Sequence, residues 1–183
     1  IACGAGYYTP TAGTATCVAC DKGSFSSASV SSGCAKCDAG TIAPDIAESK
    51  CEDCPAGKIA ALEGLHTCTF CPAGSMSSTD RSSTCEMCEA GKISSVGSTT
   101  CTICPAGMYS PADGLDTCTF AQPGYVALEG ASSETRCSSG WIAPTSGLSI
   151  CQQCTAGKYS NAENTRCLSC DPGYHTLNDG ADS

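Results

Sequence analysis

Larger side chains, most of them apolar, recur about every 17 residues in a chain otherwise rich in small and polar residues, as in a tandem repeat. Each stands two positions after a glycine. The recurring residues are Tyr8, Phe25, Ile42, Ile59, Met76, Ile93, Tyr109, Val126, Ile142, Tyr159 and His175. A glycine or asparagine follows most of them by four or five positions and indicates a turn. The pattern predicts one extended leg, a turn and a returning leg per module, with the large residues stacking into a thin core and no helix.

Cysteines keep the same period. CxxC pairs begin at Cys17, Cys34, Cys51, Cys68, Cys85, Cys101, Cys151 and Cys167, and Cys118 continues the series after Cys101. A fixed short period indicates tandem repeats. We therefore expect residues 1–183 to form one continuous array of about eleven modules, incomplete at both ends, with an irregular module pair at 118–151. Because the first residue is Ile1, we expect an internal stretch of a longer secreted chain.

The composition explains why such an array needs cross-links. The chain has 19 cysteines and 20 glycines among 183 residues, but only 22 Leu, Ile, Val and Phe residues together. Burial of so few large apolar side chains cannot offset the entropy of ordering the chain. A cysteine density this high is typical of an oxidising compartment outside the cell. We therefore predict a small disulfide-rich fold, mostly loop with short β-strands, and an elongated rod of single-disulfide modules.

Charge and hydropathy exclude several classes of partner. The net charge is −9 at pH 7, which opposes binding to nucleic acid and to anionic membrane surfaces. No apolar run is long enough to cross a membrane, so we expect no membrane insertion in this segment.

The connectivity of the cysteines can be inferred from a natural defect in the repeat. The module after Cys118 has Ala121 where its second cysteine is expected, and Glu134 where the next CxxC should begin. If the second cysteine of one CxxC pair bonds the first cysteine of the next, positions 121 and 134 would be partners. The absence of cysteine at both positions then leaves no orphan thiol. Pairing within a CxxC, or between cysteines of modules that are not adjacent, would leave two orphan thiols.

This scheme predicts nine bridges, each closing a loop worth about 3 kcal/mol in the chain-entropy model. The pairs are Cys3–Cys17, Cys20–Cys34, Cys37–Cys51, Cys54–Cys68, Cys71–Cys85, Cys88–Cys101, Cys104–Cys118, Cys137–Cys151 and Cys154–Cys167. Only Cys170 is left over, and its partner is expected near residue 183 or 184.

Two stretches resemble a known class of repeat. The sequences CPAGKIAALEGLHTC (54–68) and CPAGMYSPADGLDTC (104–118) resemble the cysteine-rich repeats of ephrin-receptor-like and tumour-necrosis-factor-receptor-like ectodomains. The resemblance covers the chain as a cysteine framework. It implies a ladder of disulfide-closed loops outside the cell, and the same pairing. Unlike the tumour-necrosis-factor-receptor pattern, the simple loop here repeats without alternating with a double-bridged module. Cysteine-rich coat proteins of protists look similar as well.

The sequence gives weaker support for metal binding or catalysis than for structural disulfides. CxxC pairs also suit zinc, but the continuous array has no natural grouping into fours, and no pair is distinguished for redox catalysis. His66 is expected to face solvent and His175 to occupy the apolar position. Paired carboxylates such as Glu86 and Glu89 have no expected cleft, and no calcium-loop motif occurs. We therefore predict no catalytic, cofactor-binding or metal-binding residues.

Two features of the sequence suggest roles in addition to a structural scaffold. The missing bridge is flanked by large side chains that form a possible partner patch or hinge, although one drifted module compensated by local packing is the favoured explanation. These residues are Phe120, Tyr125, Val126, Leu128 and Trp141. Ser and Thr gather at turns such as 26–32 and 77–84, where O-linked glycans are possible, although small polar residues also simply suit turns.

The function expected from these observations is structural. The chain is interpreted as a non-catalytic extracellular repeat protein, part of a stalk, filament or surface appendage, which associates with itself or with other extracellular proteins. The alternative is the ligand-binding or adhesive ectodomain of a cell-surface receptor.

Overall fold

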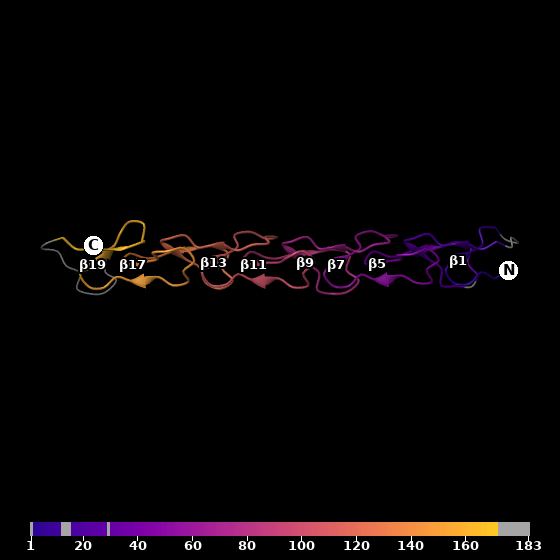
Figure 1. The fold of residues 1–183 in the computed structure, drawn as a ribbon, viewed down its shortest axis with the longest axis horizontal. Coiled ribbons are helices and arrows are strands. Elements are labelled where there is room, and N and C mark those ends of the chain that lie inside the picture. The colour runs from indigo at the N-terminus through magenta and orange to yellow at the C-terminus, as the bar shows by residue number, and fades with distance from the viewer. Residues whose placement is uncertain (1, 12–15, 29, 172–183) are drawn as a thin grey trace. The chain divides into compact units, whose positions relative to one another are not determined.

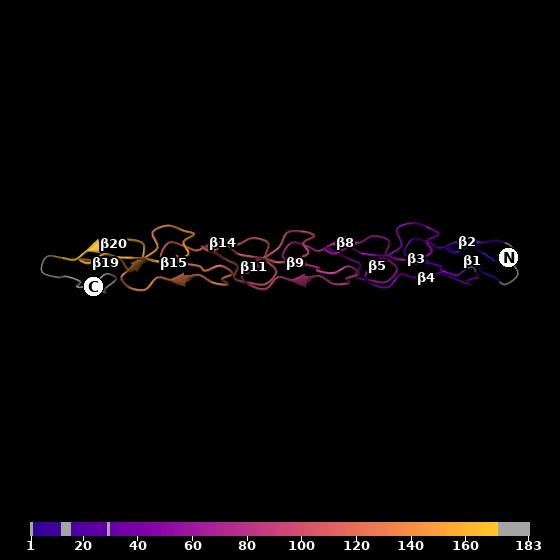
Figure 2. The ribbon, with the colours of Figure 1, turned by 90° about the horizontal axis from the view of Figure 1, so that it is seen from below.

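The computed structural model describes residues 2–11, 16–28 and 30–171. The chain divides into two compact units. Unit 1 comprises Ile1–Glu86 and Ser95–Thr100, and unit 2 comprises Met87–Ser94 and Cys101–Ser183. Within each unit, hairpins succeed one another in sequence order along the unit's long axis, as the two views in Figures 1 and 2 show.

Each module is a β-hairpin with very short antiparallel strands. In unit 1 the hairpins pair β1 (Tyr7–Tyr8) with β2 (Val18–Ala19), β3 (Ser24–Phe25) with β4 (Ala35–Lys36), β5 (Thr41–Ile42) with β6 (Glu52–Asp53), and β7 (Lys58–Ile59) with β8 (Thr69–Phe70). Strand β9 (Ser75–Met76) also lies in unit 1, and β10 (Glu86–Met87) spans the limit between the units.

Unit 2 continues the same pattern. Its hairpins pair β11 (Lys92–Ile93) with β12 (Thr102–Ile103), β13 (Met108–Tyr109) with β14 (Thr119–Phe120), β15 (Tyr125–Val126) with β16 (Thr135–Arg136), β17 (Trp141–Ile142) with β18 (Gln152–Gln153), and β19 (Lys158–Ser160) with β20 (Cys167–Ser169). The described residues contain no helix. The predicted fold class, a disulfide-rich tandem repeat of short β-hairpins, is confirmed.

From the β5–β6 hairpin onward, the turn of each described hairpin contains a residue with a left-handed backbone. Glycine takes this conformation in most turns, and Asn164 takes it with φ 56°, as the sequence predicts. Ala47 and Arg81 also take it, with φ 61° and 62°, which the sequence does not predict. The expected turn residues Gly13 and Gly180 lie outside the described residues, as does His175.

The core is made of cysteines and small residues, so the prediction that the large residues form it is wrong. Among the described residues, the most buried side chains are the second cysteine of most CxxC pairs and the small residue directly after most of the large ones. They include Cys20, Cys37, Cys54, Cys71, Cys88, Cys104 and Cys154, with Ser26, Ala43, Ala60, Ser77, Ser94, Ser110, Ala127 and Ala143. The large residues from Tyr8 to Tyr159 are only half-buried.

Close backbone contact explains this core. A Cβ on Gly23 would lie 1.9 Å from the carbonyl oxygen of Gly64, two hairpins further along the chain. The Gly23 N–H donates to the Ala43 carbonyl of the next hairpin (2.9 Å), and the Gly64 N–H donates to the Cys37 carbonyl (2.8 Å). Backbones this close leave room between them only for side chains the size of alanine, serine or half-cystine.

Candidate functional site

Nine disulfides close the hairpins, and they join the same nine cysteine pairs that the absence of cysteines at positions 121 and 134 predicts. Each links residues 13 or 14 positions apart. Among the described residues, Cys170 alone is a free cysteine, and its expected partner position near 183 lies outside them. Because the paired sulfurs are bonded to one another, they are not available as zinc ligands.

The hairpin at residues 121–137 lacks a disulfide, and we call it the unbridged hairpin. Ala121 occupies the place of the missing cysteine and is fully buried. Glu134 occupies the place of the other, and its Oε2 accepts a hydrogen bond from the Gln122 N–H at 2.7 Å. A charge-assisted hydrogen bond therefore closes this loop beside the position where the others are closed covalently.

The backbone contacts of the unbridged hairpin match those of its bridged neighbours. The Ala121 N–H donates to the Gly107 carbonyl (2.9 Å), just as the Cys104 N–H donates to the Gly91 carbonyl (2.9 Å). Its turn residue Gly130 donates to the Cys104 carbonyl (2.8 Å). Loss of the bridge thus leaves the stacking pattern intact, because backbone hydrogen bonds and glycine contacts carry it.

The predicted partner patch is spread over three successive hairpins. Phe120 ends β14, Tyr125 and Val126 form β15, and Trp141 begins β17. Phe120 is 59% exposed and Leu128 is 69% exposed, whereas the other three are half-buried. Partner binding by these side chains stays a prediction.

Phe120 belongs to a recurrent contact that the sequence analysis does not identify. The residue before the second cysteine of a CxxC pair lies against the turn residue two hairpins further along. The contacting pairs are Lys36 with Gly64, Asp53 with Arg81, Phe70 with Gly97, Met87 with Gly114, Ile103 with Gly130, Phe120 with Gly147, and Arg136 with Asn164. Large side chains cover bare glycine turns, and polar partners meet the turns that carry polar side chains.

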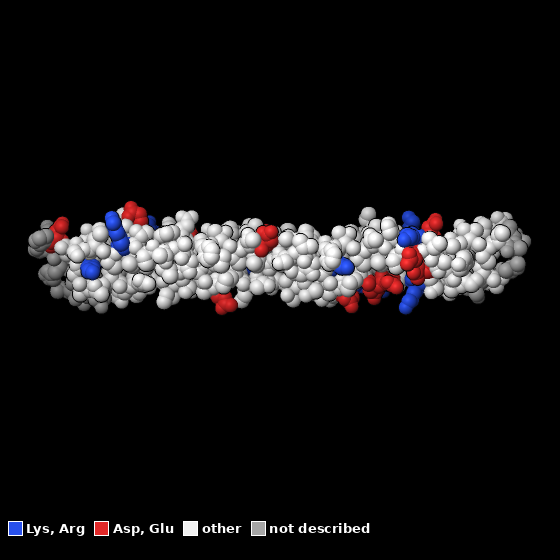
Figure 3. Space-filling view, viewed as in Figure 1, with Lys and Arg blue, Asp and Glu red and all other residues white. Residues whose placement is uncertain are grey.

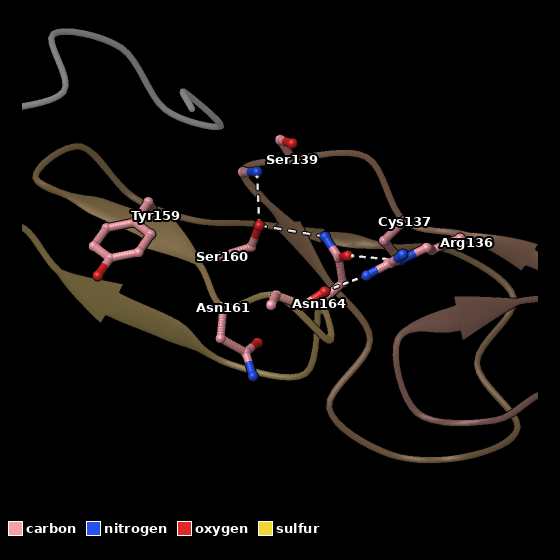
Figure 4. A pocket seen from close by; sticks show the side chains of 9 residues that line it. Arg136, Cys137, Ser139, Tyr159, Ser160, Asn161 and Asn164 are labelled. Carbon is pink, nitrogen blue, oxygen red and sulfur yellow. Dashed lines mark hydrogen bonds between the residues drawn. The ribbon is translucent and has the colours of Figure 1, made fainter. Parts of the chain in front are cut away.

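The pair with the most hydrogen bonds, Arg136 with Asn164, lies beside a cavity of about 380 Å³ in unit 2. Figure 4 shows Arg136 and Ser160 converging on Asn164, with Tyr159 apart from this network. Arg136 Nε donates to Asn164 Oδ1 (3.1 Å), and its Nη2 donates to the Ala162 carbonyl. Asn164 is 6% exposed and donates to the carbonyls of Ser138 and Trp141, both at 3.0 Å.

These hydrogen bonds serve the fold. Among the described residues, no buried side-chain nitrogen or oxygen lacks a partner, so no unpaired buried polar atom faces this cavity.

No protein-family model matches the chain, and no curated protein matches it. The structure supports the coarser part of the resemblance stated above, a tandem cysteine-rich repeat.

The charged side chains that the structure describes are mostly exposed. On the face drawn in Figure 3, acidic side chains lie mostly singly or in small groups beside a few basic ones. The ion pairs of Lys22 with Asp45 and of Arg81 with Asp38 are exposed, with N–O distances of 3.4 Å. No group of three or more His, Cys, Asp or Glu side chains that could hold a metal occurs in the described part of the chain.

Two further expectations concern single residues and membranes. His66 is exposed, as the sequence predicts. Within the ranges that the structure describes, no helix is long and apolar enough to cross a membrane.

Proposed function

We propose that the chain is a non-catalytic extracellular structural repeat protein, part of a stalk, filament or surface appendage. One observation carries the proposal: successive hairpins are closed by disulfides and tied by repeated backbone hydrogen bonds to the next hairpin and to the one after it. The residues that recur with the period are those that closure and stacking require. In a repeat fold of this kind, stability comes from each module and its neighbours rather than from one large core.

The disulfides support a location outside the cell. A series of structural disulfides that runs from Cys3 to Cys167 is typical of proteins that fold in an oxidising compartment. The disulfides also suit a protein that bears tension, because a loop closed by a covalent bond cannot be drawn out while that bond holds.

The second candidate function is the ligand-binding or adhesive ectodomain of a cell-surface receptor. Its support is the resemblance to ephrin-receptor-like and tumour-necrosis-factor-receptor-like repeats, together with the exposed apolar side chains Phe120 and Leu128 near the unbridged hairpin. Aromatic side chains exposed on a rigid scaffold are typical anchors in protein interfaces.

The expected partners are further copies of the chain or other extracellular proteins, and O-linked glycans on the turn hydroxyls. Ser27, Ser32, Ser78 and Thr79 are exposed, which suits glycosylation, whereas Ser26 and Ser77 are buried in the core. An intact mass equal to that of the bare polypeptide would exclude the glycans.

Electron microscopy of the native material tests the proposed function. Fibres or surface appendages labelled by an antibody against this chain are the expected result. Labelling confined to single molecules at the plasma membrane, in a chain that also carries a membrane span and a cytoplasmic domain, would favour the receptor and overturn the proposal.

A further inference from the structure

We propose that the unbridged hairpin is an extensible link, the stretch of this array that lengthens under tension while the disulfides hold the other hairpins closed. The biological use of such a link rests on the proposed structural function, but the property itself follows from the covalent connectivity.

The disulfides set a small limit on how far a bridged module can extend. Bridged cysteines have Cα–Cα distances of 5.6–5.8 Å. Tension on an oxidised chain passes through this bridge and then through the few residues of the CxxC pair. At about 3.5 Å per residue, a bridged module therefore extends to only about 16 Å, even when all its hydrogen bonds have broken.

The unbridged hairpin has no such limit. No bridge lies between Cys118 and Cys137, so all the peptide units between them can be pulled straight. Their extended length is about 65 Å, whereas the same stretch closed by a bridge at positions 121 and 134 would extend to only about 27 Å. Within the part of the array from Cys3 to Cys167, the other gaps between successive bridges are the short CxxC spacers. The largest single extension available to the oxidised array is therefore concentrated at this hairpin.

Only non-covalent contacts keep this hairpin closed. Within it, the Gln122 N–H is bonded to Glu134. To its neighbours, it is tied by hydrogen bonds such as Gly130 N–H to the Cys104 carbonyl and Ala127 N–H to the Leu148 carbonyl. Each of these bonds is individually weak because water competes for the same groups, and all can re-form after release. The link therefore opens without bond breakage and closes again when tension falls.

Opening also separates the hairpins on either side. Gly107 and Gly147 belong to the hairpins before and after the link, and their backbones touch across it. The Gly147 N–H is bonded to the Ala121 carbonyl at 2.8 Å. Straightening residues 121–134 removes both contacts, whereas the bridges Cys104–Cys118 and Cys137–Cys151 keep their own loops closed.

The experiment is single-molecule stretching of the oxidised chain of 183 residues, held at its two ends. The matched variant A121C/E134C supplies the missing bridge, which peptide mapping without reduction would verify. The new bridge would resemble Cys88–Cys101, which has a sequence separation of 13 and a Cα–Cα distance of 5.6 Å. At about 3.5 Å per residue, closing such a loop shortens the fully stretched chain by about 40 Å. We expect this loss together with the disappearance of the largest reversible lengthening step.

A second variant tests the same inference in the opposite direction and does not depend on forming a new bridge. C88A/C101E copies the Ala121 and Glu134 pair into a hairpin whose bridge has the same sequence separation of 13. It should lengthen the stretched chain by about 40 Å and add a second reversible step.

Two results would overturn the inference: a wild-type chain whose stretched length matches that of A121C/E134C, or one whose lengthening at residues 121–134 does not reverse. Neither result depends on whether the native material is a filament, so failure of the link is distinguishable from failure of the proposed function.

Discussion

The close approach of backbones two hairpins apart can be tested with Gly107→Ala in unit 2. Gly107 has φ 89°, and a Cβ there would lie 2.1 Å from the carbonyl oxygen of Gly147. Since real Cβ atoms essentially never come within 3.0 Å of such an atom, the two backbones must move apart by about 1 Å. The substitution therefore strains the contact that stacks one hairpin on the next but one.

The expected loss follows from the hydrogen bonds at this contact. The Gly107 N–H is bonded to the Ala127 carbonyl and the Gly147 N–H to the Ala121 carbonyl, both at 2.8 Å. Weakening both costs about 2 kcal/mol, and a left-handed alanine costs about 1–2 kcal/mol more. We therefore expect Gly107→Ala to lower the free energy of unfolding by about 3–4 kcal/mol.

Gly157→Ala is the matched control, because it separates the two contributions. Gly157 has φ 81°, and a Cβ there would meet no described heavy atom within 4 Å. This variant places an alanine in a left-handed conformation but creates no backbone clash. Its free energy of unfolding should therefore fall by only about 1–2 kcal/mol. The difference between the variants measures the close approach itself.

The assay is equilibrium unfolding in guanidinium with the disulfides intact, followed by fluorescence. Trp141 is the single tryptophan, and it begins β17 in the hairpin whose turn contains Gly147, so its signal reports on the strained contact. Equal losses of stability in Gly107→Ala and Gly157→Ala would refute the reasoning, since the clash would then contribute nothing.

Two smaller perturbations test the contacts between side chains and turns. Asn164→Ala removes a buried, fully hydrogen-bonded side chain from a left-handed turn and should cost about 3 kcal/mol in the same Trp141 assay, with Asn164→Gly restoring about 1 kcal/mol; equal losses would contradict this. Asp53→Ala breaks an exposed contact with Arg81 at 4.0 Å, so it should lower the free energy of unfolding by less than about 0.5 kcal/mol. That loss should disappear in thermal unfolding at about 1 M salt, where screening acts over a few ångströms.

The fold class and the connectivity were accessible to sequence reasoning because a repeat supplies its own comparisons. One module with two substitutions, Ala121 and Glu134, was enough to identify which cysteines pair. The short legs and the glycine turns followed from local chemistry. The legs and turns are properties that one module displays by itself, and the connectivity needed only a comparison between modules.

What sequence reasoning missed depends on contacts between modules. Large apolar residues were assigned to the core, although a small residue recurs directly after them, usually alanine or serine as at Ser26, Ala43 and Ala60, and was a signal in the sequence. The turns at Ala47 and Arg81 were missed because neither residue favours a left-handed backbone. Their conformation is imposed by the position each occupies in the stack, where the Ala47 N–H donates to the Cys20 carbonyl at 2.8 Å and the Arg81 N–H to the Cys54 carbonyl at 2.7 Å.

The same contacts explain why the array tolerates a missing bridge. Within each unit, a described hairpin is held by its own closure and, where such hairpins follow it, by the next hairpin and by the one after that, so removing one closure leaves the other two sets of contacts in place. The two polar turn residues that replace glycine in the described hairpins are matched two hairpins earlier, Arg81 by Asp53 and Asn164 by Arg136. Substitution at one position is therefore compensated at a distance of two modules. It follows that losing a bridge leaves the folded arrangement unchanged and alters what happens under load, because only the bridges limit how far the chain can be drawn out.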